Sequence, residues 1–176
     1  LETYEQEKLV NRAGFVIHSA IHAAHRHLNC VIHTHTADGI AVSAQKHGLL
    51  PISQHALKFH RHLAYHEYEG VALSTDEQKR LIQDLAGHRA MILRNHGLLT
   101  AGESIARAFH EIYFLERACQ AQIKALSGGA ELHYPSDEVC LKTAKQFNSP
   151  LIEPILQRAW QAALSLIEPQ YSEYTS

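Results

Sequence analysis

The chain has 176 residues, of which 45% are hydrophobic and 19% charged, and its formal net charge is −2. That length and composition suit one globular domain, residues 1–176, with a substantial core. The sequence has no basic run of the kind that would indicate a nucleic-acid partner. It also has no apolar run that approaches the ~20 residues of a membrane span. No secretory signal opens the sequence and the three cysteines lie far apart, so we expect a cytoplasmic protein with buried thiols.

Hydrophobic periodicity predicts helices and short strands in alternation, which indicates an α/β layered fold. Helices are expected over residues 15–28, 37–46, 74–86, 103–126, 136–147 and 151–167, and strands over 30–35, 49–52, 62–65 and 90–94. A loop carrying His96 is expected to lead from the last of these strands to the long helix at 103. The strands are few for a complete sheet, which suggests that strands are missing from this chain.

The most informative stretch is His33-Thr34-His35, which ends the first apolar strand. Successive side chains of a strand point to opposite faces, so His33 and His35 share one face, roughly 6.5–7 Å apart along the strand. A second apolar run, 90–93, delivers His96 just past its own end. Histidines that leave the ends of two core strands favour a three-histidine metal site with open positions, the arrangement of catalytic zinc.

Two other interpretations of the histidines stay open. The same side chains could simply form hydrogen bonds at the ends of their strands. A second cluster, His18, His22 and His25, follows the i, i+4, i+7 spacing of one helix face, although it lacks the acid of an H-E-x-x-H metal motif. We expect most of this cluster to form a polar helix face, with His18 the member best suited to face a pocket.

Groups that can move protons are concentrated in Tyr65-His66-Glu67, shortly before a turn at Gly70. Phenol, imidazole and carboxylate side chains all serve as general acids or bases in enzymes. We predict a functional role for one of these three residues. The alternative is a solvated loop whose tyrosines pack at its edge.

Several motifs together resemble the class II aldolase/adducin family. They are His33-Thr34-His35-Thr36, Arg94-Asn95-His96-Gly97-Leu98, Gly102 and, on the helix that follows, Leu115-Glu116-Arg117-Ala118. The match covers about residues 10–130, with residues 131–176 as C-terminal helices and tail. The resemblance implies a three-layer α/β/α sandwich, a tetramer with active sites at subunit interfaces, and zinc or another divalent metal bound by His33, His35 and His96.

Two features depart from the aldolases of this family. When their S-S-E-x-x-x-H-x-x-I-Y pattern is laid on this chain, the histidine falls on His18 and the catalytic glutamate falls on Gly14, which has no side chain. The stretch around Gly14 is instead similar to the adducin-like branch. The sequence also begins almost at this helix, so we expect the N-terminal portion of the family, with its substrate-gripping loop, to be truncated or absent.

The missing carboxylate weighs against an ordinary sugar-phosphate aldolase, because loss of a general base costs roughly 10²–10⁴-fold in rate. Decarboxylation generates an enolate without prior proton abstraction, and zinc can stabilise that enolate. We therefore expect a zinc-dependent carbon–carbon lyase, a decarboxylase ahead of an aldolase, acting on a small oxo or hydroxy acid or a sugar-like substrate. Tyr65, which aligns approximately with the interface tyrosine of the family, is the expected proton donor, and Glu67 or His18 could replace the missing base.

The competing hypothesis is a non-catalytic module that binds a partner or a small ligand, because adducin resembles this fold and serves in cytoskeletal assembly. A zinc hydrolase is a third hypothesis, which Gly14 disfavours because the nearest acid that could activate a water is absent. We also expect a homo-oligomer, with Trp160 and the tyrosines of the tail as candidate interface groups.

Overall fold

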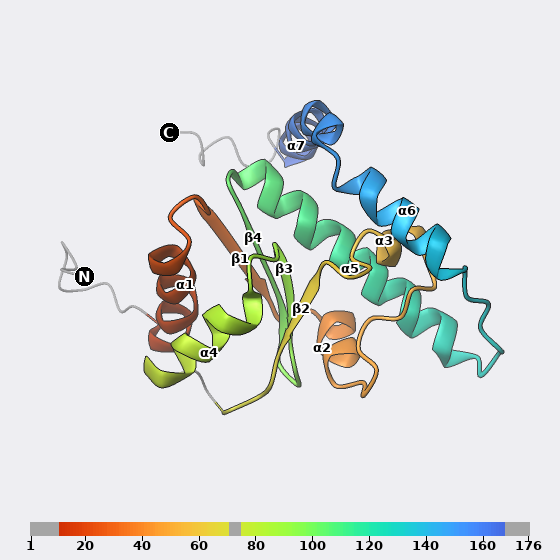
Figure 1. The fold of residues 1–176 in the computed structure, drawn as a ribbon, viewed down its shortest axis with the longest axis horizontal. Helices are drawn as coiled ribbons and strands as arrows, with labels where there is room; N and C mark the ends of the chain where they lie inside the picture. Colours follow the sequence, from red (N-terminus) through yellow and green to blue (C-terminus); the bar gives the residue numbers. More distant parts are fainter. Residues whose placement is uncertain (1–10, 71–74, 168–176) are drawn as a thin grey trace.

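The computed structural model describes residues 11–70 and 75–167, in which a four-stranded sheet lies between two layers of helices (Figure 1). The elements are α1 (Arg12–Ala24), β1 (Cys30–Thr34), α2 (Ala37–Ser43), α3 (Gln54–Leu57), β2 (Leu63–His66), α4 (Thr75–Leu85), β3 (Ala90–Leu93), β4 (Gly97–Gly102), α5 (Ile105–Ser127), α6 (Asp137–Phe147), the 3-10 turn η1 (Pro150–Ile152) and α7 (Glu153–Ile167). None of the helices in these described segments is long and apolar enough to cross a membrane.

One face of the sheet is covered by α1 and α4, and the other by α2 and α5 (Figure 1). The strand order is β1-β4-β3-β2, with β2 and β3 parallel and the other neighbours antiparallel. Because side chains alternate along a strand, β3 supplies both cores: Met91 packs toward α1 and α4, whereas Ile92 packs toward α5. The expected three-layer α/β/α sandwich is confirmed.

Two strand predictions differ from the structure. Residues 97–102 form β4, an inner strand of the sheet, where we expected a loop. Every residue of β4 is buried, so the strand shows no alternation, and the glycine at each end imitates a turn. The strand predicted over 49–52 is wrong. The Leu49 N–H donates to Tyr65 Oη and the Leu50 N–H to Gln122 Oε1, so this segment pairs with side chains instead of a strand.

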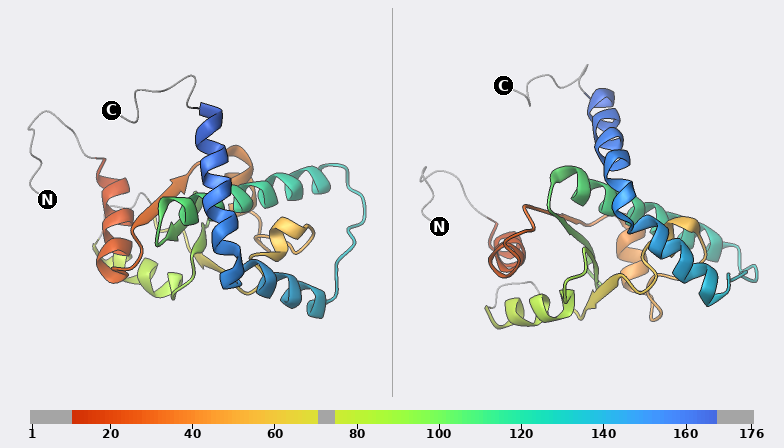
Figure 2. Two further views of the ribbon diagram at one scale, coloured as in Figure 1. Left: turned by 90° about the horizontal axis from the view of Figure 1, so that it is seen from above. Right: turned by 45° about the horizontal axis from the view of Figure 1, so that its top comes forward.

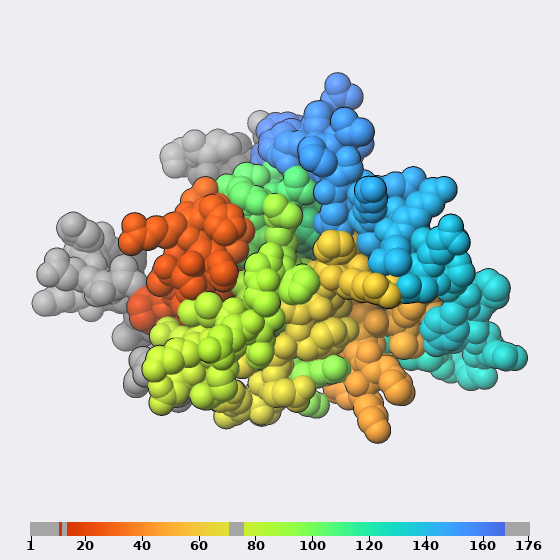
Figure 3. All heavy atoms as spheres, viewed as in Figure 1, coloured from red at the N-terminus to blue at the C-terminus, as the bar shows by residue number. Residues whose placement is uncertain are grey.

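The C-terminal helices lie outside the sandwich, and both were predicted within a few residues of their bounds. α6 packs on α3, and α7 packs on α5. Figure 2 shows α7 crossing α5, where the rings of Trp160 and Phe109 lie with their centroids 5.2 Å apart. The space-filling view shows α1 and α4 together on one side of the molecule, and α3 beside α6 on the other (Figure 3).

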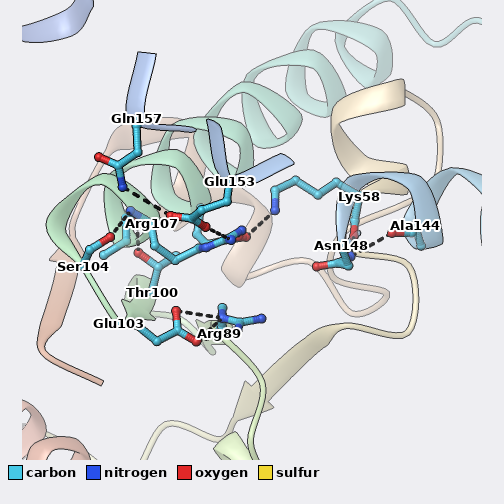
Figure 4. Close-up of polar contacts among 12 residues, drawn as sticks. Lys58, Arg89, Thr100, Glu103, Ser104, Arg107, Ala144, Asn148, Glu153 and Gln157 are labelled. Atoms are coloured by element: carbon cyan, nitrogen blue, oxygen red, sulfur yellow. Dashed lines mark hydrogen bonds and ion pairs between the residues drawn. The ribbon is translucent and has the colours of Figure 1, made fainter. Parts of the chain in front are cut away.

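A buried ion pair ties the end of α3 to α5. Lys58 Nζ donates to Glu111 Oε2 at 2.5 Å, and the two side chains are only 1% and 4% exposed. Burial lowers the pKa of Lys58, although the negative charge of Glu111 opposes this shift. Figure 4 shows the pair's surroundings, in which Arg107 contacts Glu153, and Asn148 donates to the Lys58 carbonyl at 3.2 Å. The network joins four separate segments of the chain on the α5 side of the sheet.

Candidate metal centre

His33 lies on β1, and its side chain is on the sheet face that carries the α1–α4 core, because it follows Val31 by two residues. Its Nδ1 lies 2.9 Å from the carbonyl oxygen of Leu98 on β4. A carbonyl oxygen can only accept, so Nδ1 carries the proton and donates, which leaves a lone pair on Nε2. The Leu98 carbonyl therefore fixes both the tautomer and the orientation of the His33 ring.

His96 lies in the short turn, residues 94–96, that connects β3 to β4. Asn95 has a φ of 53°, a left-handed conformation that asparagine adopts more readily than most residues. The turn is held on two sides, since the Arg94 N–H donates to the His66 carbonyl at 2.8 Å and Arg94 Nη1 donates to the Gln45 carbonyl at 2.8 Å. The hairpin thus presents His96 at a fixed place beside the end of β1.

The three imidazoles converge. Nε2 of His33 lies 2.8 Å from Nε2 of His35 and 3.2 Å from Nε2 of His96. One nitrogen from each ring lies within 4.8 Å of the other two. Four-coordinate zinc at about 2.0–2.1 Å from its ligands separates their nitrogens by roughly 3.3–3.4 Å, which is within about 0.6 Å of both separations measured from His33.

The electrostatics of the cluster also suit a metal. Burial is the main cause that lowers the pKa of His33, and it lowers the pKa of His96 to about 4, with His33 and His35 adding to the shift of His96. The imidazoles of His33 and His96 are therefore neutral at neutral pH, the protonation state that a metal requires of its histidine ligands. The donor set, its convergence and the neutral state of His33 and His96 together fit a zinc ion.

Two of the predicted acid–base residues, His18 and Glu67, lie in different surroundings. His18, on α1, is close enough that its charge adds to the effect of burial on the pKa of His33. Burial, followed by the charge of His22, lowers the pKa of His18 itself. Glu67 follows β2 and is 86% exposed, with its Oε1 3.9 Å from Arg94 Nε. In the described part of the chain, neither residue has a hydrogen bond to the three clustered histidines.

Tyr65 lies on the opposite face of the sheet from His33. Its ring packs against the core formed with α2 and α5, its hydroxyl accepts the Leu49 N–H at 3.0 Å, and the Arg94 guanidinium lies 4.3 Å from the ring centroid. Burial raises the pKa of this phenol. Within one chain the structure does not bring Tyr65 to the clustered histidines, so its role as a proton donor stays a prediction.

The residue that sequence reasoning missed is Tyr68. Its ring lies edge-on to the ring of His96, with centroids 6.3 Å apart, and 53% of the residue is exposed. His66, by contrast, is buried, and its Nδ1 lies 2.7 Å from Asp84 Oδ2. The only available signal was the position of Tyr68 in a loop that follows a strand, and such a signal does not say which tyrosine of the loop faces the site.

The rival cluster does not converge: His18 and His22 lie on α1, but the helix ends at Ala24, before His25 and short of the end predicted at residue 28. His22 Nδ1 donates to the Leu28 carbonyl at 2.9 Å, which stabilises the chain as it leaves α1. Among the described residues, the group formed by His33, His35 and His96 is the one whose donor atoms gather closely enough to hold a metal ion. The single helix face predicted for the three residues is therefore formed by His18 and His22 alone.

Comparison with known proteins adds the family to this geometry. Residues 1–123 match the model of the class II aldolase and adducin N-terminal domain. The crystal structure of an aldolase II superfamily protein from Pseudomonas syringae is 50% identical, with a TM-score of 0.90, and the match covers 95% of this chain and 67% of that one. The two proteins therefore share the same fold over nearly the whole of this chain.

Two curated relatives are of different kinds. Alpha-adducin of Rattus norvegicus is 49% identical over 120 residues, which cover 67% of this chain and 16% of that protein. The decarboxylase NovR of Streptomyces niveus is 37% identical over 152 residues, which cover 86% of this chain and 56% of that protein. Two further bacterial relatives are also longer, since this chain spans 65% of one and 48% of the other. With most of its length matched by the family model, this chain belongs to the class II aldolase and adducin family.

Proposed function

We propose that this chain is a zinc-dependent carbon–carbon lyase, of the decarboxylase or aldolase type, that acts on a small oxo or hydroxy acid or a sugar-like substrate. The observation that carries the proposal is the convergence of His33, His35 and His96 from the end of β1 and the β3–β4 hairpin. Membership of the class II aldolase family supports a lyase-type reaction, and the similarity to a decarboxylase supports this branch of it.

His33, His35 and His96 would hold zinc, or another divalent metal, through one nitrogen each, with the remaining positions open to substrate. When bound, the ion supplies Lewis-acid stabilisation of the negative charge that develops on the substrate oxygen as an enolate forms. The protein's own contribution is to fix the rings before substrate arrives. The Leu98 carbonyl does this for His33, and the braced hairpin does it for His96.

The absence of a carboxylate at position 14 favours decarboxylation over aldol cleavage. Gly14 lies in α1 with open space where a side chain would be, so the site has no base at this position. A decarboxylase needs a proton donor only after carbon dioxide has left. We propose His18, on the metal side of the sheet, and the exposed Glu67 for that proton handling. Tyr65 would serve only a site formed with a neighbouring copy of the chain.

The first experiment is metal analysis of the purified protein beside a His33→Ala/His35→Ala variant. We expect about one divalent ion per wild-type chain and none in the variant, since both lost rings are ligands. A wild-type protein that holds no stoichiometric metal at neutral pH would refute the lyase proposal. The metal-loaded protein is then incubated with small 2-oxo acids, sugar phosphates and aryl esters: release of carbon dioxide or an aldehyde supports a lyase, whereas ester cleavage alone supports a hydrolase.

A second candidate function is a binding or assembly module without turnover. The similarity to alpha-adducin and the glycine at position 14 are the observations that favour it. Turnover separates the two candidates, because a module that only binds a partner converts none of these substrates. Zinc binding together with turnover of a keto acid supports the lyase, and zinc binding with no turnover of any of these substrates supports the module.

We further propose that the chain forms a homo-oligomer, with a tetramer expected from its family. Light scattering coupled to size exclusion measures this directly. Trp160 already packs on Phe109 within the chain, so any contribution of Trp160 to an interface comes from its remaining exposed edge.

A further inference from the structure

Thr36 has an unusual hydrogen bond for a residue that begins a helix. It occupies the N-cap position of α2 with extended backbone angles, φ −72° and ψ 149°, yet its side chain makes no capping hydrogen bond. At the corresponding position of α3, α5 and α6, a serine oxygen accepts a backbone N–H of its own helix. The Thr36 side chain therefore does not provide α2 with the capping hydrogen bond that three other helices of this chain have. Such a hydrogen bond contributes about 1 kcal/mol to stability.

The Thr36 hydroxyl instead donates to Glu116 Oε2, at 2.5 Å, across 80 residues of sequence. Glu116 lies on α5, and its other oxygen, Oε1, accepts a hydrogen bond from Gln120 Nε2 at 3.2 Å. Both oxygens are therefore engaged, which fixes the carboxylate in one orientation. Hydrogen bonds to an ionised acceptor are roughly twice as strong as bonds between neutral groups, so this contact outweighs the cap that it replaces.

A glycine provides the space for this contact. A Cβ added at Gly39 would lie 2.6 Å from Thr36 Oγ1 and 2.8 Å from Leu98 Cγ. Gly39 has no positive φ, so its backbone does not require glycine, and the need for a small residue is steric. The first turn of α2 is thus shaped around the Thr36 hydroxyl.

His35, the neighbour of Thr36, lacks the support that the other two histidines have. His33 is oriented by the Leu98 carbonyl, and His96 by the braced hairpin. His35 is the most exposed ring of the cluster, and in residues 11–70 and 75–167 its ring nitrogens have no hydrogen-bond partner except His33. The position of the His35 ring is therefore set by its own backbone, at the point where β1 ends and α2 begins.

From these contacts we infer that Glu116 is a positioning residue of the metal centre, which acts through Thr36 to set the direction in which His35 leaves β1. The inference rests on the proposed function in one respect, that the three histidines hold a metal. Glu116 is not itself a ligand. Loss of a residue that orients a metal ligand without binding the metal typically weakens metal affinity by roughly 10–100-fold.

The test compares zinc affinity, by competition with a chromogenic chelator, across variants of the whole chain. Thr36→Val removes the hydroxyl and keeps the shape, and Glu116→Ala removes the acceptor. We expect each to weaken zinc binding by roughly 10–100-fold, and the double variant to weaken it no further than either alone, because both break the same contact. Thr36→Ser keeps the hydroxyl and is expected to restore wild-type affinity.

The matched control is Thr100→Val. The Thr100 hydroxyl also connects the sheet to α5, donating to the Ala108 carbonyl at 3.1 Å, but its side chain is on the face opposite His33. This variant reports any general loosening of α5, and we expect its zinc affinity to match that of the wild type. The visible absorption of bound Co²⁺ provides a second readout, since a displaced His35 alters its ligand field and a merely less stable protein does not.

The outcomes separate this inference from the function on which it rests. If the wild type binds zinc and Thr36→Val binds it equally well with the same Co²⁺ spectrum, the inference fails and the lyase proposal stands. If the wild type binds no zinc, the lyase proposal fails. The role of Glu116 in positioning His35 is then tested on the metal-free protein. A crystal structure of Thr36→Val in which the His33 and His35 Nε2 atoms keep their wild-type separation then overturns it, and a displaced His35 ring supports it.

Discussion

Addition of a Cβ atom is expected to have opposite effects on stability at two glycines of this chain. At Gly97, which follows His96, a Cβ would lie 2.3 Å from the backbone oxygen of Thr34, a distance that no side-chain adjustment can relieve. At Gly14, in α1, a Cβ would meet nothing within 4 Å. The first glycine permits β4 to lie against the end of β1, whereas the second only costs α1 backbone entropy.

We therefore expect Gly97→Ala to lower the free energy of unfolding by ~1–3 kcal/mol, because the added Cβ must shift the backbone. Zinc binding should weaken as well, because the displaced hairpin carries His96. Gly14→Ala, the control, should raise the free energy of unfolding by roughly 0.5–1 kcal/mol. Urea denaturation with zinc titration measures both effects, and a Gly97→Ala variant as stable as the wild type would contradict the expected close approach.

His110 makes the stability of this protein depend on pH. It is 6% exposed, its Nδ1 has no hydrogen-bond partner, and burial, with the charges of Lys58 and Arg107, lowers its pKa from 6.5 to about 3. As the pH falls below 6.5, the unfolded chain takes up a proton that the folded chain does not, so stability is lost progressively down to about pH 3.

A His110→Phe variant should lose less stability than the wild type between pH 6.5 and pH 4, since the phenylalanine cannot titrate. The measurement is the free energy of unfolding in urea at several pH values. Replacement of the exposed His133 by asparagine is the control and should leave the wild-type slope unchanged. Parallel pH curves for the wild type and His110→Phe would show that His110 does not cause the dependence.

The candidate site shows which residue-level features the sequence could predict. His33, His35 and His96 were predicted because strand alternation and strand ends are local properties. The face occupied by Tyr65 and the contact of Tyr68 with His96 depend on where β2 ends relative to the β3–β4 hairpin. The contact of Thr36 with Glu116 joins residues that are 80 positions apart, and no local pattern contains that information.

The helices and strands differ in how well their local sequences predict them. α5 carries an apolar stripe at helical spacing, begins with a serine cap and has Gly128 at its end, so its predicted bounds were nearly right. β4 is buried throughout and begins and ends with a glycine, so its local sequence resembles a loop. Its pairing with β1 and β3 is what identifies it as a strand. Segment 49–52 has the hydrophobicity of a strand, but its backbone is bound by side chains from β2 and α5.

The Lys58–Glu111 pair allows a test of how α3 and α5 are joined. Lys58→Met leaves a buried carboxylate without its partner and should cost ~3–5 kcal/mol of stability. The double variant Lys58→Met/Glu111→Leu, which removes both charges, should recover most of that loss, because neither desolvated group then remains. A double-mutant cycle from thermal or urea unfolding gives the coupling. Equal losses in the single and double variants would indicate that the pair contributes through packing alone.

The whole molecule confirms the layered fold that its family implies, with helices on both faces of one sheet. The resemblance supplied this architecture, because the local sequence patterns alone yielded too few correct strands to order the sheet. The order β1-β4-β3-β2 also explains the location of the histidines: it places the end of β1 beside the turn that leads into β4.

A metal held between these strands should stabilise the entire domain. Zinc that binds only the folded state adds ~2.7 kcal/mol to the free energy of unfolding when its free concentration is 100 times the dissociation constant. We expect the melting temperature of the wild type to rise with zinc and that of His33→Ala/His35→Ala to stay constant. Identical shifts in both proteins would show that the stabilising zinc binds elsewhere.

The pairing of β1 with β4 also fixes when the metal centre can form during protein synthesis. His33 and His96 are separated by 63 residues, so at roughly 5–20 residues per second the ribosome makes His96 about 3–13 seconds after His33. Throughout that interval the imidazoles of His33 and His35 lack His96, and β4, the strand that pairs with β1 in the described residues, has not yet been made. The proposed metal can therefore bind all three histidines only after the β3–β4 hairpin has been made and has docked beside β1.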